Sequence, residues 1–314
     1  MTSEALRTAT GGTSAGDDRV VAGTGLSAGT RVVGVMGFPV GHSLSPLLHN
    51  TAFAHLGVDW VSVGFPVPPG RAGAALAGAR DLGIRGLSVT MPHKEDVADA
   101  VDVLTPAAER LGAVNCVFDD DGVWFGDNTD GAGMIAALRR GGRFEPLGRR
   151  CMVVGAGGAA RAVIAALGDA GAAEVVVVNR TAERAEAAAG LAGPVGRVGG
   201  AGEAPTCELV VNATPAGMAG VVDGPTGWPV DPSLLGPAQV VVDLVYHPPV
   251  TDWLAAAARR GATTANGLGM LVHQAALQIE RWTGLDAPVD AMWDAVAGAT
   301  GGAAFGATSG AAGG

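Results

Sequence analysis

A single lysine is the most informative residue for chemistry in this chain. The 20 basic residues comprise 19 arginines and one lysine, Lys94. Arginine keeps its proton near neutral pH, whereas a lysine amine can release one when its surroundings lower its pKa. Asp130 falls in the first turn of a predicted helix, where the helix dipole keeps a carboxylate ionised. Lys94 and Asp130 together would exchange protons with an alcohol or a ketone. The alternatives are a surface lysine and an aspartate that only favours its helix.

Two serines could bind a small carboxylate. Ser43 and Ser45 lie on a loop that ends where a helix is predicted to begin at Pro46. Hydroxyl groups and the positive end of a helix dipole both favour an anion. Alternatively, Ser45 is the N-cap residue of this helix, with Pro46 at its first position, and Ser43 is a polar loop residue.

A glycine turn predicts a dinucleotide site in the middle of the chain. An apolar run over residues 151–154 leads into a turn, and a helix is predicted from about Ala159. The first glycine allows the tight turn, the second allows the backbone to approach a pyrophosphate, and the small Ala160 allows the helix to pack closely on the strand. The helix N-terminus would offer free N–H groups to the phosphates. The turn residues are Gly155, Ala156, Gly157 and Gly158.

The residues after the next strand indicate which dinucleotide binds. An acidic residue about 20 positions past the glycine turn would favour NAD. Here a strand over 174–178 is followed by Asn179, Arg180 and Thr181, with Arg184 one turn into the next helix. Two guanidinium groups favour a 2′-phosphate, and therefore NADP. The alternative is a surface cluster that opens a helix, with Thr181 as its cap.

These candidate residues stand on loops between predicted elements. The ranges in the first part are strands 31–36, 59–65, 85–90, 113–118 and 122–125, and helices 46–56, 71–82 and 131–138. The second part alternates strands at 151–154, 174–178, 208–212 and 239–244 with turns or helices, which predicts a parallel, doubly wound sheet. From Asn266 the chain is predicted to be helical through 282 and again over 289–296. The Gly- and Ala-rich ends, 1–29 and 298–314, are predicted to be disordered.

Composition excludes several classes of function. The net charge of −10 argues against generic nucleic-acid binding, and no apolar segment is long enough to span a bilayer. The N-terminus carries no secretory signal pattern. Three widely spaced cysteines are interpreted as reduced core residues, so the expected compartment is the cytoplasm. No metal site is expected. Asp127 is predicted to cap the following helix, and His93 to be a packed ring or, alternatively, a second proton-transfer group.

The motifs in combination resemble the shikimate dehydrogenase family. They occur in the family's order over roughly residues 31–297. They are GHSLSP at 41–46, SVTMPHK at 88–94, GAVN at 112–115, GDNTDG at 126–131, GAGGAAR at 155–161, NRTAER at 179–184, NATPAGM at 212–218 and NGLGMLVHQAA at 266–276.

The resemblance implies an α/β fold with an inserted Rossmann-type domain. The N-terminal substrate-binding domain would comprise residues 30–130 and 266–297, and the NADP domain residues 131–265, between a leader over 1–29 and a tail over 298–314. The implied activity is the reversible, NADP(H)-linked interconversion of 3-dehydroshikimate and shikimate by a cytoplasmic monomer or homodimer.

The resemblance also assigns roles to individual residues. Lys94 matches the catalytic lysine, which works with Asp130. Ser43 and Ser45 match serines that hold the substrate carboxylate, and Tyr246 matches a tyrosine near the carboxylate and the nicotinamide. The residues that match binders of the substrate hydroxyls are Thr90, Asn115, Asp130 and Gln274. Further cofactor contacts are implied for Thr214, Leu244, Gly267 and Met270, beside the glycine turn with Ala159.

Two other functions compete with this interpretation. Related quinate/shikimate enzymes that use NAD often have a threonine in place of the second serine and an acidic residue after the cofactor strand, and Ser45 and Arg180 point away from them. A non-catalytic NADP(H)-binding regulator would lack the proton-transfer pair, which is present here. His93 departs from the family pattern, since many relatives have an apolar residue at this position.

Overall fold

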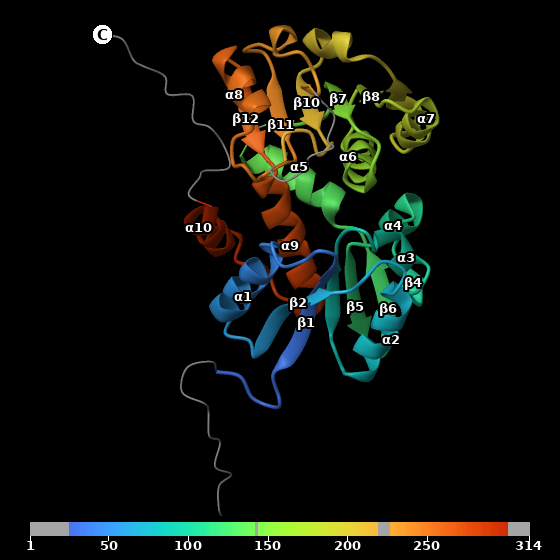
Figure 1. Ribbon diagram of the computed structural model, residues 1–314, viewed down its shortest axis with the longest axis vertical. Coiled ribbons are helices and arrows are strands. Elements are labelled where there is room, and N and C mark those ends of the chain that lie inside the picture. Colours follow the sequence, from blue (N-terminus) through green and yellow to red (C-terminus); the bar gives the residue numbers. More distant parts are fainter. Residues whose placement is uncertain (1–24, 142–143, 219–226, 301–314) are drawn as a thin grey trace, which may run out of the picture. The chain divides into compact units, whose positions relative to one another are not determined.

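The structure, a computed structural model, describes residues 25–141, 144–218 and 227–300 (Figure 1). Residues 25–30 belong to a separate N-terminal unit, Met1–Thr30, in which the Thr30 N–H donates to the Ser27 carbonyl across 3.1 Å. Most of the predicted disordered leader and the tail beyond residue 300 lie outside the described residues. The predicted tail begins too early, because the last helix continues through 298–300 as far as Thr300.

The first sheet carries most of the predicted chemistry. Its strand order is β2-β1-β3-β5-β6-β4; β1, β2 and β3 are parallel, and β5 is antiparallel to β3 and β6. The strands are β1 Arg31–Gly37, β2 Trp60–Pro66, β3 Gly86–Val89, β4 Val103–Leu104, β5 Cys116–Asp120 and β6 Val123–Asp127. The predicted hairpin is therefore confirmed as β5 and β6.

Helices cover both faces of this sheet. They are α1 Ser45–Leu56, α2 Ala72–Asp81, α3 Lys94–Ala98 and α4 Pro106–Leu111. One apolar cluster joins Leu48 and Phe53 of α1 to Ile279 and Met292 near the end of the chain. A second cluster packs α2 and α3 on the sheet, with Leu76 and Val97 as members. The helices from the end of the chain are thus part of the core of the first sheet.

The second sheet has the predicted doubly wound form. Its six strands are all parallel, in the order β12-β11-β10-β7-β8-β9. The strands are β7 Arg150–Val154, β8 Glu174–Val178, β9 Gly196–Val198, β10 Leu209–Asn212, β11 Val240–Asp243 and β12 Thr263–Asn266; the helices are α6 Gly158–Asp169, α7 Ala182–Gly190 and α8 Asp252–Arg259, with short 3₁₀ turns at Gly193–Val195, Ala201–Thr206 and Pro232–Leu234. The strand order reverses between β7 and β10, which is where such sheets bind ligands.

Two long helices connect the sheets. Helix α5, Asp130–Arg140, leads from β6 toward β7, and α9, Leu268–Thr283, leads back from β12. The two helices pack on each other, and α10, Val289–Thr300, follows α9 onto α1. The domain limits 30–130, 131–265 and 266–297 remain a prediction.

Three local predictions are wrong. Ser45 is not an N-cap, because α1 begins at Ser45 itself and Leu44 occupies the cap position without a capping side chain. Asp127 does not cap α5: it ends β6, and its carboxylate accepts hydrogen bonds from Thr105 Oγ1 (2.6 Å) and Arg281 Nε (3.0 Å). Asn266 ends strand β12, a strand too short for its period to stand out in the sequence.

The cysteines behave as predicted. Cys116, Cys151 and Cys207 are free and buried. Burial raises the pKa of the Cys151 thiol to about 12, so it stays protonated and unreactive.

Among the described residues, no helix is long and apolar enough to cross a membrane, and no cluster of acidic, cysteine and histidine side chains could hold a metal ion.

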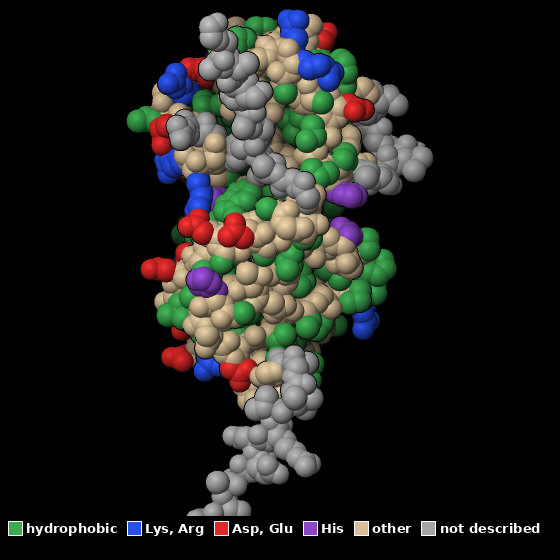
Figure 2. Space-filling view, turned by 90° about the vertical axis from the view of Figure 1, so that its left-hand side faces the viewer, with side chains coloured by type: hydrophobic (Ala, Val, Ile, Leu, Met, Phe, Trp, Pro, Cys, Tyr) green, Lys and Arg blue, Asp and Glu red, His purple; other side chains and the backbone are tan. Residues whose placement is uncertain are grey.

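Several surface charges form ion pairs between residues far apart in the sequence. Figure 2 shows one face, on which acidic and basic side chains are interspersed with apolar ones. Exposed ion pairs include Arg80–Asp102, Arg110–Asp169 and Arg149–Glu208. Pairs this exposed contribute little to stability, because solvent screens the two charges.

Candidate active site

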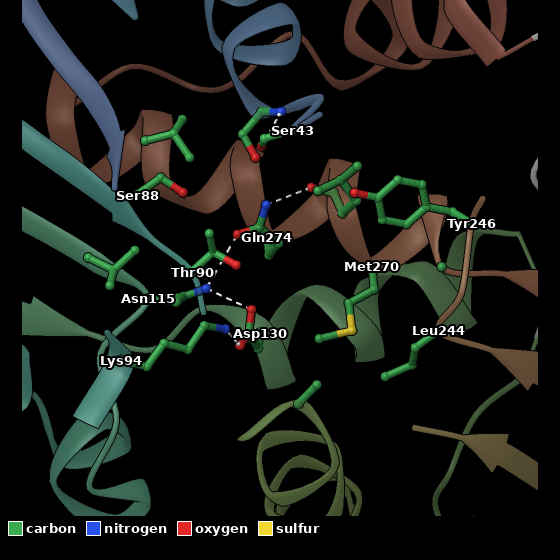
Figure 3. A pocket seen from close by; sticks show the side chains of 16 residues that line it. Ser43, Ser88, Thr90, Lys94, Asn115, Asp130, Leu244, Tyr246, Met270 and Gln274 are labelled. Carbon is green, nitrogen blue, oxygen red and sulfur yellow. Dashed lines mark hydrogen bonds and ion pairs between the residues drawn. The ribbon is translucent and has the colours of Figure 1, made fainter. Parts of the chain in front are cut away.

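One cavity collects the predicted substrate and catalytic residues (Figure 3). It has a volume of about 200 Å³ and opens at the carboxyl end of the first sheet. Thr90 follows β3, Lys94 begins α3, Asn115 precedes β5 and Asp130 begins α5. The other residues predicted to bind the substrate also line this cavity; they are Ser43, Ser45, Tyr246 and Gln274.

Lys94 and Asp130 form the predicted pair. Lys94 Nζ lies 2.5 Å from Asp130 Oδ2, and only 20% of the lysine side chain and 7% of the aspartate side chain are exposed. Asp130 Oδ1 accepts a hydrogen bond from Asn115 Nδ2 across 2.8 Å. This geometry excludes a merely solvated lysine, because Nζ is paired with a carboxylate that lines the same cavity.

Side-chain amides orient the wall around this pair. Asn115 Oδ1 accepts from the Thr129 N–H across 2.7 Å, which directs Asn115 Nδ2 toward Asp130. Gln274 Nε2 donates to the Leu271 carbonyl across 2.9 Å, and its Oε1 lies 3.3 Å from Asn115 Nδ2. The amides therefore have defined orientations before any ligand enters.

The serines lie at the start of α1. The Ser45 N–H donates to Ser43 Oγ across 3.2 Å, and both side chains line the cavity. Ser45 is in the first helical turn, where N–H groups without intrahelical acceptors favour an anion. Tyr246 faces the same cavity, and burial raises the pKa of its phenol, so it remains a neutral hydrogen-bond donor.

The glycine turn has the form that a pyrophosphate needs. Gly155 has a φ of +120°, and a Cβ at this position would lie 3.0 Å from the Ala213 carbonyl oxygen. A Cβ on Gly157 would meet nothing within 4 Å, so the space that a side chain would take is open to a ligand. Helix α6 begins at Gly158 without a capping side chain, which leaves its first N–H groups free.

Other predicted cofactor residues lie around the turn. Ala159, Leu244, Gly267 and Met270 line the same cavity as Lys94. Thr214 is beside Gly155, and its hydroxyl donates to Asn212 Oδ1 across 2.6 Å. The structure thus places this group of predicted cofactor residues next to the proton-transfer pair.

The two arginines proposed to select the cofactor are accessible. Arg180 and Arg184 are exposed, and neither forms an ion pair with a carboxylate of the described residues. Asn179 Nδ2 donates to the Thr181 carbonyl across 3.0 Å. Thr181 occupies the N-cap position of α7 but makes no capping hydrogen bond, which weakens the interpretation of this cluster as a simple helix start.

Comparison with known proteins identifies the family. The model of the shikimate dehydrogenase substrate binding domain matches residues 35–117, that of shikimate/quinate 5-dehydrogenase matches 141–196, and that of the shikimate 5′-dehydrogenase C-terminal domain matches 267–297. A shikimate dehydrogenase (NADP⁺) of Methanopyrus kandleri is 47% identical over 277 residues, which cover 85% of this chain and 95% of the relative. This chain belongs to the shikimate dehydrogenase family.

Solved structures agree with this assignment. A crystal structure of a shikimate dehydrogenase in complex with NADP⁺ has a TM-score of 0.81 at 36% identity, covering 88% of this chain and 97% of that one. A shikimate 5-dehydrogenase from Thermus thermophilus in complex with NADP(H) and shikimate has a TM-score of 0.78 at 38% identity, over 86% and 99% of the two chains. A quinate dehydrogenase from Corynebacterium glutamicum in complex with NAD matches at 31% identity with a TM-score of 0.78, over 86% and 99%.

Sequence reasoning missed several residues that line the cavity around Lys94. Val35, Ser88, Val89 and Leu271 also line it. Ser88 could have been found, because residues two apart on a strand point to the same face, and Thr90 was already a candidate. Its hydroxyl adds one more polar group to the wall.

His93 does not take part in the cavity. Its ring is fully buried, and Nε2 lies 2.7 Å from the Val67 carbonyl oxygen. The ring therefore packs beside the loop, which is the first of the two interpretations from the sequence. The residue that departs from the family pattern does not line the cavity.

Asp243 is a buried carboxyl group at the end of β11. It accepts hydrogen bonds from Asn212 Nδ2 (2.9 Å), Thr251 Oγ1 (2.8 Å) and the Val245 N–H (3.1 Å). Burial outweighs these contacts and raises its pKa from 3.8 to about 6. The next residue, Leu244, lines the cavity, so Asp243 anchors one edge of the site.

Replacing Asp243 with asparagine should make folding less sensitive to pH. Because the folded pKa is raised, the stability from the protonated group is present below about pH 4 and is lost as the pH rises through about 6. The variant's free energy of unfolding, relative to wild type, should therefore rise by about 2 kcal/mol between about pH 4 and about pH 7.5. Urea unfolding at several pH values measures this difference, and a difference that does not change with pH would contradict the raised pKa.

Proposed function

We propose that this protein catalyses the reversible, NADPH-dependent reduction of 3-dehydroshikimate to shikimate. The observation that carries the proposal is the Lys94–Asp130 pair in a cavity that the glycine turn's helix also lines. Membership of the shikimate dehydrogenase family supports the same reaction.

The cavity wall offers a position for each part of the substrate. Ser43, Ser45 and the N-terminus of α1 would hold the ring carboxylate, with the Tyr246 phenol beside it. The groups proposed to bind the hydroxyls and the ketone are Thr90, Asn115, Asp130 and Gln274.

Lys94 would carry the proton. Bound NADPH supplies the hydride to the ketone carbon, so negative charge develops on the ketone oxygen. The Lys94 ammonium stabilises this charge and gives one proton to the oxygen, which yields the alcohol. Asp130 holds Nζ in place, and the partly exposed lysine regains its proton from water. In the oxidation direction the neutral amine takes the hydroxyl proton.

The cofactor would lie along the carboxyl ends of the second sheet. Its pyrophosphate fits the open space at Gly157 and the free N–H groups of α6. Arg180 and Arg184 would pair with the 2′-phosphate, with Asn179 and Thr181 beside them. The residues proposed to contact the nicotinamide half are Ala159, Thr214, Leu244, Gly267 and Met270. We also propose the domain limits given above and a cytoplasmic monomer or homodimer.

A spectrophotometric assay tests the proposed function. Purified protein mixed with 3-dehydroshikimate and NADPH should consume the nicotinamide absorbance, and NADH should be used with a lower kcat/KM. Flat traces would favour a non-catalytic NADP(H)-binding protein. Faster turnover with quinate and NAD would favour the second candidate, a quinate dehydrogenase, which the structural similarity to that enzyme makes worth testing.

A further inference from the structure

A buried polar cluster lies behind the cavity wall. It consists of His49 on α1, Ser62 on β2 and Gln278 on α9, all of which are almost completely inaccessible to solvent. None of the three lines the cavity. Buried polar groups of this kind need partners, so the direction of each hydrogen bond can be worked out.

Gln278 uses both of its amide hydrogens on residues of the cavity wall. Nε2 donates to Gln274 Oε1 across 2.9 Å and to the Asn115 carbonyl oxygen across 3.0 Å. A flipped amide would place Oε1 against these two oxygens, and neither of them carries a hydrogen. The wall therefore determines the orientation of Gln278, and Gln278 in turn holds the wall.

His49 is the second buried member of the cluster, and its observed partner is Ser62. Burial lowers the pKa of His49 to about 3, so its ring is neutral and carries a single N–H. Nδ1 lies 2.9 Å from Ser62 Oγ, whose hydroxyl can donate to it. His49 Nε2 and Gln278 Oε1 are both buried without a hydrogen-bond partner among the described residues. A Ser62 hydroxyl that donates to Nδ1 leaves the ring proton on Nε2.

The consequence for the cavity is the orientation of Gln274. Its Oε1 accepts from Gln278 behind the wall, and one hydrogen of its Nε2 is used by the Leu271 carbonyl. The remaining hydrogen of Nε2 is free for a ligand oxygen. Without Gln278, Gln274 Oε1 would lose its shorter hydrogen bond (2.9 Å) and keep only the longer one from Asn115 Nδ2 (3.3 Å).

We propose that Gln278 is a positioning residue that fixes Gln274 and Asn115 for substrate binding. The proposal rests on the proposed function, since the substrate is 3-dehydroshikimate. It acts on the substrate side of the cavity and leaves the glycine turn untouched.

The test replaces Gln278 with methionine, which has a similar length but no donor. The KM for 3-dehydroshikimate should rise about tenfold, whereas the KM for NADPH should stay within about twofold of wild type. Gln278→Glu keeps the shape but places carboxylate oxygens against Gln274 Oε1 and the Asn115 carbonyl, and should raise the same KM further.

A matched control separates positioning from folding. Gln239 is another buried glutamine, and its Nε2 donates to the carbonyls of Ala204 (2.7 Å) and Cys207 (3.0 Å), away from the cavity. Gln239→Met removes the same groups and should leave the KM for 3-dehydroshikimate unchanged.

The outcomes distinguish the two proposals. If the wild-type protein does not turn over 3-dehydroshikimate, the proposed function fails. If the wild type is active and both Gln278 variants keep its KM for 3-dehydroshikimate within about twofold, or change both KM values equally, the positioning role is wrong.

Discussion

Replacing Lys94 with alanine should lower kcat for 3-dehydroshikimate reduction by about 10²–10⁴-fold, which is the usual effect of removing a general acid. The reason is specific to this site. Nζ lies at the wall of the cavity and 2.5 Å from Asp130, and no other lysine exists in the chain that could take its place. Affinity for NADPH, measured by fluorescence titration, should remain within about twofold because Lys94 lies outside the glycine turn. Near-full turnover would show that the proton comes from elsewhere.

Lys94→Arg provides the sharper control. Arginine keeps the positive charge but cannot release its proton near neutral pH, so this variant should bind substrate and still turn over poorly.

A second control uses the composition of the chain. Because Lys94 is the only lysine, an amine-directed acylating reagent can modify one side chain, apart from the N-terminus. Loss of activity should follow modification of Lys94, and bound shikimate should slow both.

Removing Arg180 and Arg184 together should change the choice of cofactor. Each exposed guanidinium can form a charge-assisted hydrogen bond with a 2′-phosphate, worth about 1.5–3 kcal/mol. The double alanine variant should therefore lose about 100-fold or more in kcat/KM with NADPH. Its kcat/KM with NADH, which has no 2′-phosphate, should stay within about threefold of wild type.

The matched control for this variant is an arginine with a similar setting. Arg259 is exposed near the end of α8 and has no carboxylate partner among the described residues. Arg259→Ala removes one positive charge from the surface, against two in the double variant, and should leave both values of kcat/KM unchanged. If Arg259→Ala weakens NADPH as much as the double variant does, the effect comes from net charge. If NADPH and NADH fall equally in the double variant, the arginines do not read the 2′-phosphate.

Much of the site could be predicted because its residues stand at recognisable places in local structure. The glycine turn between β7 and α6 has a sequence signature, since only glycine tolerates the backbone angle at Gly155. Lys94 and Asp130 each begin a helix, and the strand–helix alternation of the second sheet is periodic. Short elements were harder to predict, and β12 has only four residues. Asp127 was predicted to cap a helix, but its partners, Thr105 and Arg281, lie far from it in the sequence.

The sequence by itself determined which groups are present and which local turns carry them. It determined that the chain has one titratable lysine, a dinucleotide turn and two arginines after the cofactor strand. Only the tertiary structure decided which of these groups meet. Asn115 and Gln278 are 163 residues apart, and the orientation of a side-chain amide depends on the partners that packing brings to it. No local pattern encodes those partners, so the contacts of Gln278 and the orientation of Gln274 could be seen only once α9 and the first sheet were packed together.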